Sequence, residues 1–496
     1  MPHPFPLASV FTNGMRRDVD RTELPGGSAY NMVDFIPDEI QAVTGGRGGW
    51  TYAGPVMSGA TQILDVSYAP FSAGAQVVAH DSTNIWNVLT GASIASGITQ
   101  AFSPPVFHRN FLIFPGNMAG GGVGKYDGTT VSVLTGGSYP KGGRATVYKD
   151  RLVLANDGTN QNRVWFSAAG DPTTWDLTFG YWDTTGAVKG LGATLNSILI
   201  FHNDSVERLR GTTPPPGSDM VLEPFLPNVG CIDPFTIAYW NNRIVWASSQ
   251  GIHMSDGATM VDLTASAQMK TYWQSLMVGY DSTSWRIAAG IYRDHYIICV
   301  NNGSGILLDC LCLSLNSQTM WRFSNIHGSS FARTSDQQQE KLYMGEFNAG
   351  RVVELSSLWS PSATVKRDAD GTNPTPIIET GMFRGFDRLH RRWIESMGKQ
   401  KWRFGYVDYD LRDAASDNPT ATLSYCTDPT GSYAQAGLSL PATTKVSRVR
   451  RSFSPTQGGA THSQMLGLKY AVTGPYASAK LVTLEGDFSP IEIGAL

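Results

Sequence analysis

The feature that most constrains the fold of this chain is a short apolar pattern that recurs along most of its length. Runs rich in Val, Ile, Leu, Tyr and Trp follow polar turns whose last residues are Asn110, Asp150, Asn196, Asn242 and Asp294. These positions are 40, 46, 46 and 52 residues apart, and similar runs follow Gln76 and Glu340, which gives up to seven units. Helical periodicity is almost absent, so the pattern predicts an all-β protein.

A second repeat runs in phase with the first. Asp127-Gly128 and Asp256-Gly257 each lie between two strand-like runs, which is the pattern of a β-hairpin, and they are 129 residues apart, or three periods of 43. A propeller blade of four short strands needs about 40–50 residues, and blades bury their faces by packing around an axis. We therefore predict a β-propeller of six or seven blades over residues 46–360. Unrelated β-sandwiches with ordinary hairpins are the alternative.

The composition changes near residue 360. Residues 361–376 contain several Pro, Thr and Asp residues and are interpreted as a linker, and residues 377–496 as a smaller C-terminal β-sandwich. Residues 1–45 contain several prolines and little periodicity, and they are interpreted as an extended N-terminal arm that ends at the run Gly45-Gly-Arg-Gly-Gly49.

The overall charge and the cysteine count exclude several classes of protein. With 38 Lys and Arg against 41 Asp and Glu, the net charge of −3 argues against a dedicated nucleic-acid binder. Five cysteines are too few, and odd in number, for a disulfide scaffold, which indicates a reducing folding compartment. We find neither a secretory signal nor an apolar run long enough to span a membrane, and we expect synthesis in a cytoplasm.

Positive charge gathers in two clusters of the C-terminal region. One reading is a solvated sandwich surface, and the other is a surface that faces DNA or docks on an acidic partner, since phosphate contacts need Lys or Arg but no base specificity. The candidate residues are Arg384, Arg388, Arg391, Arg392, Lys399, Lys401, Arg403, Lys445, Arg448, Arg450 and Arg451.

No catalytic constellation emerges from the sequence. The P-loop, HExxH and GxSxG patterns are absent, and the nine histidines show no metal-ligand spacing. Asp368-x-Asp370 and Asp408-x-Asp410 could hold Ca²⁺, but without a downstream bidentate Glu they are better interpreted as polar turns. Trp165, Trp175, Trp246, Trp321 and Trp359 could line a sugar groove, but their spacing favours packing between blades. We therefore assign no catalytic, cofactor or metal residue and expect no enzyme.

Several segments resemble, in order, the tail hub or nozzle proteins of short-tailed phages, also described as packaged-DNA stabilisation proteins. These segments are Tyr30–Glu39 with Gly45–Trp50, the Ser-x-x-Gly-Asp-Pro turn within Arg163–Trp175, Val206–Gly211, Val229–Thr236, Asn242–Trp246, Gly251–Met254 and Ile378–Phe383. The resemblance covers about half of the chain in short patches. It departs from the family in a short N-terminal arm and in the absence of an inserted fibre-docking domain.

The resemblance implies a non-enzymatic virion protein of a phage tail, assembled in the host cytoplasm. Its partners would be further copies in a cyclic ring, a hexamer by family analogy, together with portal or adaptor proteins and tail fibres or spikes. Contact with packaged double-stranded DNA would be weak and non-specific. The alternatives from other classes are a receptor- or glycan-binding tail protein, a propeller glycosidase with paired carboxylates, and a cellular propeller scaffold.

Overall fold

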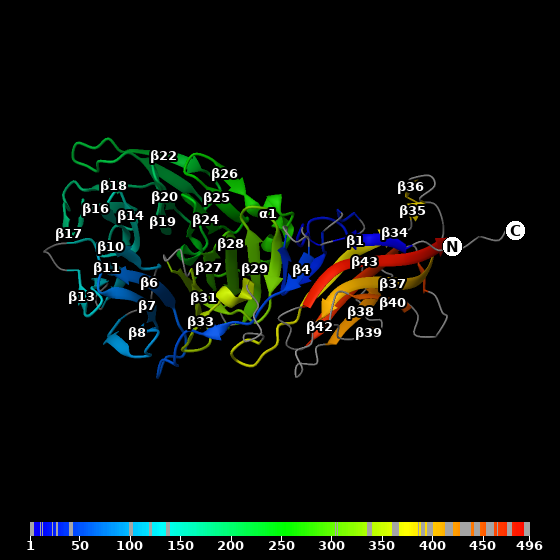
Figure 1. Ribbon diagram of the computed structural model, residues 1–496. Helices are drawn as coiled ribbons and strands as arrows, with labels where there is room; N and C mark the ends of the chain where they lie inside the picture. Colours follow the sequence, from blue (N-terminus) through cyan, green and yellow to red (C-terminus); the bar gives the residue numbers. More distant parts are fainter. Residues whose placement is uncertain are drawn as a thin grey trace.

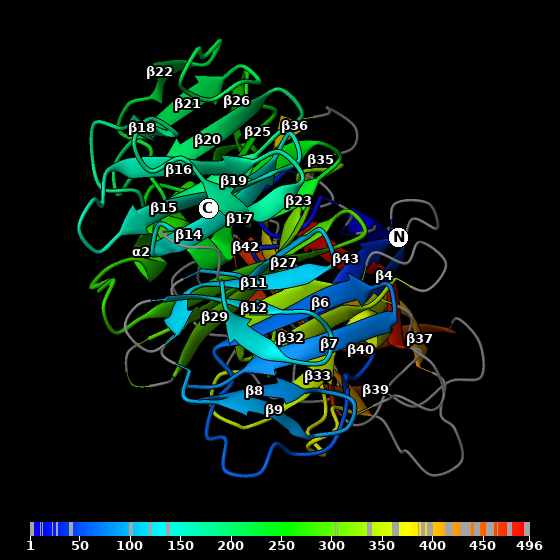
Figure 2. The ribbon, with the colours of Figure 1, turned by 90° about the vertical axis from the view of Figure 1, so that its left-hand side faces the viewer.

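The computed structural model has the predicted all-β fold, a β-propeller followed by a C-terminal β-structure (Figure 1). It describes residues 4–490 except 10, 12, 22, 26–27, 39–42, 99–102, 119–121, 135–138, 303, 305, 335–339, 360–366, 385, 388–391, 394–399, 412–419, 427–437, 441–446, 453–460, 464 and 474–478. Figure 2 views the propeller from the side opposite the C-terminal strands.

Six blades each come from one continuous stretch of chain. Their strands are β6 (Asp65–Phe71), β7 (Gly74–His80), β8 (Asn84–Asn87) and β9 (Ser93–Ser96) in blade 1; β10 (Val106–His108), β11 (Phe111–Met118), β12 (Gly122–Tyr126) and β13 (Val131–Val133) in blade 2; β14 (Gly142–Tyr148), β15 (Arg151–Asp157), β16 (Arg163–Ala168), β17 (Asp171–Trp175) and β18 (Tyr181–Asp183) in blade 3; β19 (Gly190–Ala193), β20 (Ser197–Phe201), β21 (Val206–Arg210) and β22 (Val221–Leu226) in blade 4; β23 (Ala238–Trp240), β24 (Arg243–Ala247), β25 (Ile252–Ser255) and β26 (Met260–Asp262) in blade 5; and β27 (Arg286–Tyr292), β28 (His295–Asn301), β29 (Leu307–Ser314) and β30 (Met320–Phe323) in blade 6.

A seventh sheet closes the ring with strands from both ends of the propeller. It consists of β31 (Gly328–Arg333), β32 (Leu342–Glu346) and β33 (Val352–Glu354), and its outer strand is β5 (Thr51–Tyr52). Tyr52 pairs with Val353 and Thr51 with Glu354. The first and last segments of the propeller therefore share one sheet.

The polar turns that revealed the repeat connect the first and second strands of the blades. Arg109-Asn110, Lys149-Asp150 and Asn241-Asn242 all have positive φ at both residues. This is the conformation of a type I′ hairpin turn, which Asn and Asp tolerate better than most residues. The same turn chemistry in successive blades explains why the repeat is visible in the sequence.

These turns also contact one another between neighbouring blades. The Asn110 side chain accepts a hydrogen bond from the Ser72 backbone N–H at 2.8 Å, and the Asn242 side chain accepts one from Leu195 at 2.8 Å. The Arg293 backbone N–H donates to Glu340 at 3.0 Å. Along one rim of the propeller, neighbouring blades are therefore joined by hydrogen bonds of the same turn residues that mark the repeat in the sequence.

The two Asp-Gly pairs occupy equivalent places in blades 2 and 5. Asp127 accepts hydrogen bonds from the backbone of Thr129 and Thr130, both at 2.8 Å, between the last two strands of blade 2. Asp256 does the same for the residues two and three positions later in blade 5, also at 2.8 Å. The predicted separation of three blades is confirmed.

The blade interiors are apolar on both faces. Every residue of β20 is buried, as are four of the five in β24, so these strands appear in the sequence as continuous apolar runs. Trp246 is fully buried and lies 5.2 Å, centroid to centroid, from Phe201 of the preceding blade. At this position the tryptophan packs between blades, as its spacing predicted.

Apart from a short β35–β36 hairpin, the remaining strands fall into two sets, of which the first is a separate sheet and the second continues the sheet of blade 6. The first sheet joins β1 (Pro4–Ser9), β3 (Phe35–Asp38) and β4 (Val43–Gly46) to β37 (Gln400–Leu411), β40 (Ser447–Ser452), β41 (Thr461–Ser463) and β43 (Ala479–Pro490). The second contains β2 (Asn31–Val33), β34 (Ile377–Arg384), β38 (Thr420–Cys426), β39 (Leu438–Leu440) and β42 (Met465–Thr473). The hairpin is β35 (Phe386–Asp387) with β36 (Arg392–Trp393). Much of the predicted arm therefore lies in the sheets of the C-terminal region.

Helices are few among the described residues and serve as connections. They are η1 (Pro234–Thr236), α1 (Leu263–Ser266), α2 (Lys270–Leu276) and η2 (Ser356–Trp359). The α1 and α2 helices link blade 5 to blade 6. No helix among the described residues is long and apolar enough to cross a bilayer.

Candidate functional site at the junction

Strand β2 joins the propeller to the C-terminal strands within one sheet. Val33 pairs with Arg322 of β30 in parallel, and on its other side β2 pairs antiparallel with β34, placing Met32 opposite Ile378. Blade 6 and the C-terminal strands therefore form a continuous sheet of nine strands. The outer edge of blade 6 is covered, and the two parts are connected by backbone hydrogen bonds as well as by the chain.

A shared apolar core reinforces this connection. Phe11, Met15, Met32 and Phe35 from the N-terminal segment are at most 1% exposed, and they belong to the same cluster as the core of blade 6 and the buried side chains of β42. The rings of Phe35 and Tyr470 lie 6.1 Å apart, centroid to centroid. The N-terminal segment thus contributes to the hydrophobic core on both sides of the junction.

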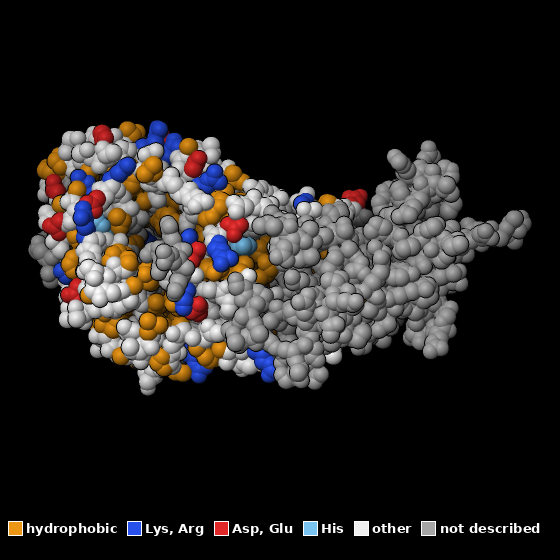
Figure 3. All heavy atoms as spheres, viewed as in Figure 1, with side chains coloured by type: hydrophobic (Ala, Val, Ile, Leu, Met, Phe, Trp, Pro, Cys, Tyr) orange, Lys and Arg blue, Asp and Glu red, His pale blue; other side chains and the backbone are white. Residues whose placement is uncertain are grey.

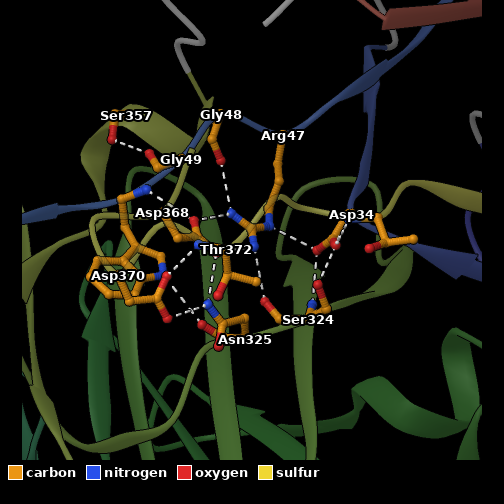
Figure 4. Close-up of polar contacts among 12 residues, drawn as sticks. Asp34, Arg47, Gly48, Gly49, Ser324, Asn325, Ser357, Asp368, Asp370 and Thr372 are labelled. Carbon is orange, nitrogen blue, oxygen red and sulfur yellow. Dashed lines mark hydrogen bonds and ion pairs between the residues drawn. The ribbon is translucent and has the colours of Figure 1, made fainter. Parts of the chain in front are cut away.

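At the centre of the junction lies Arg47, which is completely buried and uses all five of its N–H donors (Figure 4). Nε donates to Asp34 at 2.7 Å, while Nη1 and Nη2 form a bidentate pair with Asp368 at 2.8 and 2.9 Å. The other two N–H groups donate to the backbone oxygens of Gly48 and Ser324 at 2.9 and 3.0 Å. We call Asp34, Arg47 and Asp368 the buried clasp, since each comes from a different segment of the chain.

The two carboxylates of the buried clasp accept further hydrogen bonds besides those from Arg47. Asp368 also accepts hydrogen bonds from the Trp50 backbone and from the Asn325 amide, at 3.2 and 3.0 Å. Asp34 accepts from the backbone N–H groups of Ser324 and Thr375, at 2.8 and 2.9 Å. Burial opposes the charge of Arg47, but the two carboxylates outweigh it and raise the Arg47 pKa well above its ordinary value. The Arg47 guanidinium is therefore charged at neutral pH.

Local backbone geometry explains why the sequence provides glycines around Arg47. A Cβ atom on Gly49 would lie 2.0 Å from the backbone oxygen of Arg367, so only glycine allows the two segments to approach this closely. On the other side, Asp368 begins a tight turn that is closed by a hydrogen bond from Gly371 N–H at 2.8 Å. This is the polar turn that the sequence predicted in preference to a calcium site, and its first carboxylate binds Arg47.

A second cluster of polar side chains holds the N-terminal segment against blade 6. Asp309 accepts hydrogen bonds from Arg322 Nε at 2.9 Å and from the Tyr272 hydroxyl at 2.5 Å. The Arg17 guanidinium lies over the Tyr30 ring at 4.3 Å and over the Tyr272 ring at 5.2 Å. Burial together with the Asp309 charge raises the Tyr272 pKa well above its usual range, so its hydroxyl remains a donor.

The structure describes the backbone of seven of the eleven predicted basic residues. Arg384 lies in β34, Arg392 in β36, Lys401 and Arg403 in β37, and Arg448, Arg450 and Arg451 in β40. Arg388, Arg391, Lys399 and Lys445 lie outside the described residues. Strands β37 and β40 are paired, with Arg448 opposite Asp408 and Arg450 opposite Tyr406, so parts of the two sequence clusters meet in one sheet.

Sequence reasoning did not identify the buried clasp. Its only signal is an arginine among four glycines, together with acidic residues far away in the chain, and nothing in the local pattern pairs them.

On the face seen in Figure 3, Lys and Arg side chains of the propeller are interspersed with Asp and Glu rather than gathered in one patch. Within the described part of the chain, no group of three or more His, Cys, Asp or Glu could hold a metal ion.

Comparisons with known proteins add no functional argument. No family model matches the chain, and no curated protein matches it. Among solved structures, the chain is similar to one described as "AfRom2 CNH domain", with 10% sequence identity, a TM-score of 0.32, and coverage of 62% of this chain and 98% of that one. At this identity and TM-score, what that protein does carries nothing over to this chain.

Proposed function

We propose that this protein is a structural subunit of a bacteriophage tail, a ring-forming hub or nozzle protein that joins the portal or adaptor to the tail tip and lines or closes the DNA exit channel. The observation that carries the proposal is the junction. A nine-stranded sheet, a shared core and a buried clasp make the propeller and the C-terminal strands one mechanical unit. A part that transmits force between a head and a tail tip needs such a connection.

The ordered resemblance to tail hub proteins supports the same proposal. Two of the resembling segments, Tyr30–Glu39 and Gly45–Trp50, contain Asp34 and Arg47 of the buried clasp. A third, Ile378–Phe383, lies in β34, which pairs with β2. Three of the patches that carry the resemblance therefore meet at the junction, although the third is far from the other two in the sequence.

Assembly is the most direct test of the proposal. The mass of the purified protein is measured alone and after mixing with a portal-type ring, by analytical ultracentrifugation. We expect a ring of copies, six by family analogy, that forms on the partner ring. A stable trimer with no affinity for such rings would contradict the proposal and favour a receptor-binding protein.

The role of the predicted basic residues is tested in assembled phage particles. Replacing Arg388, Arg391 and Arg392 together with Ser removes three positive charges from the cluster at 384–403. Altered DNA retention or ejection from normally assembled particles would support a contact with DNA, and loss of the tail ring would support docking on a neighbour. If neither assembly nor ejection changes, these arginines belong to an ordinary solvated surface.

A further inference from the structure

A polar cavity lies at the axis of the propeller, apart from the junction. Its volume is about 450 Å³, and it is lined by residues in or close to the inner strands of several blades, including Leu64, Arg144, Lys189, Asp233 and Arg286. These residues belong to blades 1, 3, 4, 5 and 6, respectively. The volume falls within the range of small-molecule sites, which are about 300–1,000 Å³.

An apolar plug closes the inner end of this cavity. Leu64, Phe235 and Ala288 are buried and pack with Phe331 into one small cluster contributed by blades 1, 5, 6 and 7. The Arg286 guanidinium lies over the Phe235 ring, 3.4 Å from its centroid, and so faces the plug on one side. Phe235 and Phe331 also line a separate cavity of about 260 Å³, which lacks Arg144, Lys189 and Asp233. Arg333 is the one charged residue of this second cavity, whereas the first combines three cationic residues with Asp233.

Positive charge exceeds negative charge in the lining of the cavity. Arg144, Lys189 and Arg286 face a single carboxylate, that of Asp233, which already accepts a hydrogen bond from the Phe235 backbone at 2.9 Å as the cap of η1. Among the described residues, neither Lys189 nor Arg286 forms an ion pair with a carboxylate. Arg286 instead donates Nε to the Ser329 carbonyl at 2.9 Å and Nη2 to the Leu64 carbonyl.

The guanidinium of Arg286 keeps donors available for a ligand. Its Nη1 group has no hydrogen-bond acceptor among the described residues, whereas Nε and Nη2 are held by the backbone. Burial lowers the pKa of both Arg144 and Arg286, with Asp233 acting in the opposite direction in each case. An anion in the cavity would favour the charged form of both guanidinium groups and so oppose this effect of burial.

We propose that this cavity binds a small, multiply charged oxyanion of the phosphate or polycarboxylate class. Arginine presents a planar fork of donors that matches carboxylate and phosphate oxygens, and lysine adds a point charge. The backbone bonds and the Phe235 ring hold the Arg286 fork in place before a ligand arrives, which reduces the entropy lost on binding. The inference does not depend on the role of the protein in a tail.

The test uses the full-length protein with inorganic phosphate, citrate and chloride at equal ionic strength. Thermal unfolding and isothermal titration are measured for the unchanged protein, Lys189→Gln and Lys149→Gln. Lys189 makes no side-chain hydrogen bond among the described residues, so its substitution should leave the fold intact. Lys149 is exposed in the turn between β14 and β15, and its variant changes the net charge equally but outside the cavity.

Because phosphate and citrate stabilise proteins in general, we expect them to raise the melting temperature of the unchanged protein by more than that of Lys189→Gln. The salt with the larger excess shows which class the cavity prefers. A charged hydrogen bond contributes about 1.5–3 kcal/mol, so Lys189→Gln should weaken binding about tenfold or more, and Lys149→Gln should leave it unchanged. Arg286→Lys, which keeps the charge and loses the fork, should weaken it as well. Equal melting temperatures in all three salts, or equal affinity of Lys189→Gln and the unchanged protein, would overturn the proposal.

Discussion

Replacing Arg47 with Met tests whether the buried clasp holds the junction together. Met fills a similar volume without charge, so the variant leaves Asp34 and Asp368 buried with no positive partner. All three side chains are 0% exposed in the ion pairs at 2.7 and 2.8 Å, so water cannot take the place of the guanidinium. Removing one partner of such a pair costs about 3–5 kcal/mol.

The expected loss is large enough to measure by thermal unfolding. A destabilisation of 1 kcal/mol lowers the melting temperature by about 2–4 °C in domains of 150–250 residues, and less in larger ones. For a cooperative unit of 496 residues the shift is about 1 °C per kcal/mol, so we expect Arg47→Met to melt about 3–5 °C below the unchanged protein. We also expect faster tryptic cleavage after Arg367, because its carbonyl packs against Gly49 beside the clasp.

Two further variants make the experiment specific. Arg109→Met removes an arginine from the exposed ion pair with Asp150, whose side chains are 55% and 46% exposed, and its melting temperature should stay close to that of the unchanged protein. The triple variant Arg47→Met, Asp34→Asn, Asp368→Asn removes all buried charges and should recover part of the loss. If Arg47→Met melts no lower than Arg109→Met, the clasp does not stabilise the junction and our reasoning is wrong.

Three other predictions concern the pH dependence, the thiols and the glycines. Burial raises the Asp65 pKa to about 7, so the stability that the protonated carboxyl contributes is complete below the unfolded pKa of about 3.9 and is lost as the pH rises through 7. At pH 8.5, Asp65→Asn should therefore unfold at a higher urea concentration than the unchanged protein. Equal urea midpoints of the two proteins at that pH would contradict the prediction. All five cysteines are buried free thiols, so five should react with a thiol reagent after denaturation without reductant and none rapidly before it. Gly49→Ala should lower the melting temperature, because its Cβ would meet the Arg367 carbonyl, whereas Gly59→Ala, where nothing lies within 4 Å, tests the cost of positive φ alone.

The propeller could be predicted from the sequence because its repeat depends on local chemistry. The turn at Asn110 and its equivalents requires residues that tolerate positive φ, and the second strand of each blade is buried on both faces, so both features recur at a fixed interval. The Asp-Gly hairpins at Asp127 and Asp256 are likewise defined by a few neighbouring residues. Such signals survive in a single sequence because each is complete within one blade.

The junction and the axial cavity could not be predicted because their residues meet only in the folded chain. Arg47 and Asp368 are 321 positions apart, and Arg144 approaches Asp233 and Arg286 only because the first strands of the blades converge. The isolated arginine among glycines at 45–49 was visible, but its partners were not. The closing strand β5 was missed for the same reason, since its two residues pair with a strand about 300 positions later.

The apolar plug limits how this protein could act in a DNA channel. Leu64, Phe235, Ala288 and Phe331 pack together at the propeller axis, and the cavities beside them have volumes of only about 260 and 450 Å³. A duplex could therefore not pass through the propeller itself. In the proposed role, the channel would have to be enclosed by several copies arranged in a ring, so the surfaces that matter for DNA are outer faces of each subunit. Enlarging the axis by Phe235→Ala should then leave ejection unchanged, whereas variants that prevent ring formation should abolish it. An ejection rate that followed the size of the residue at position 235 would contradict this arrangement.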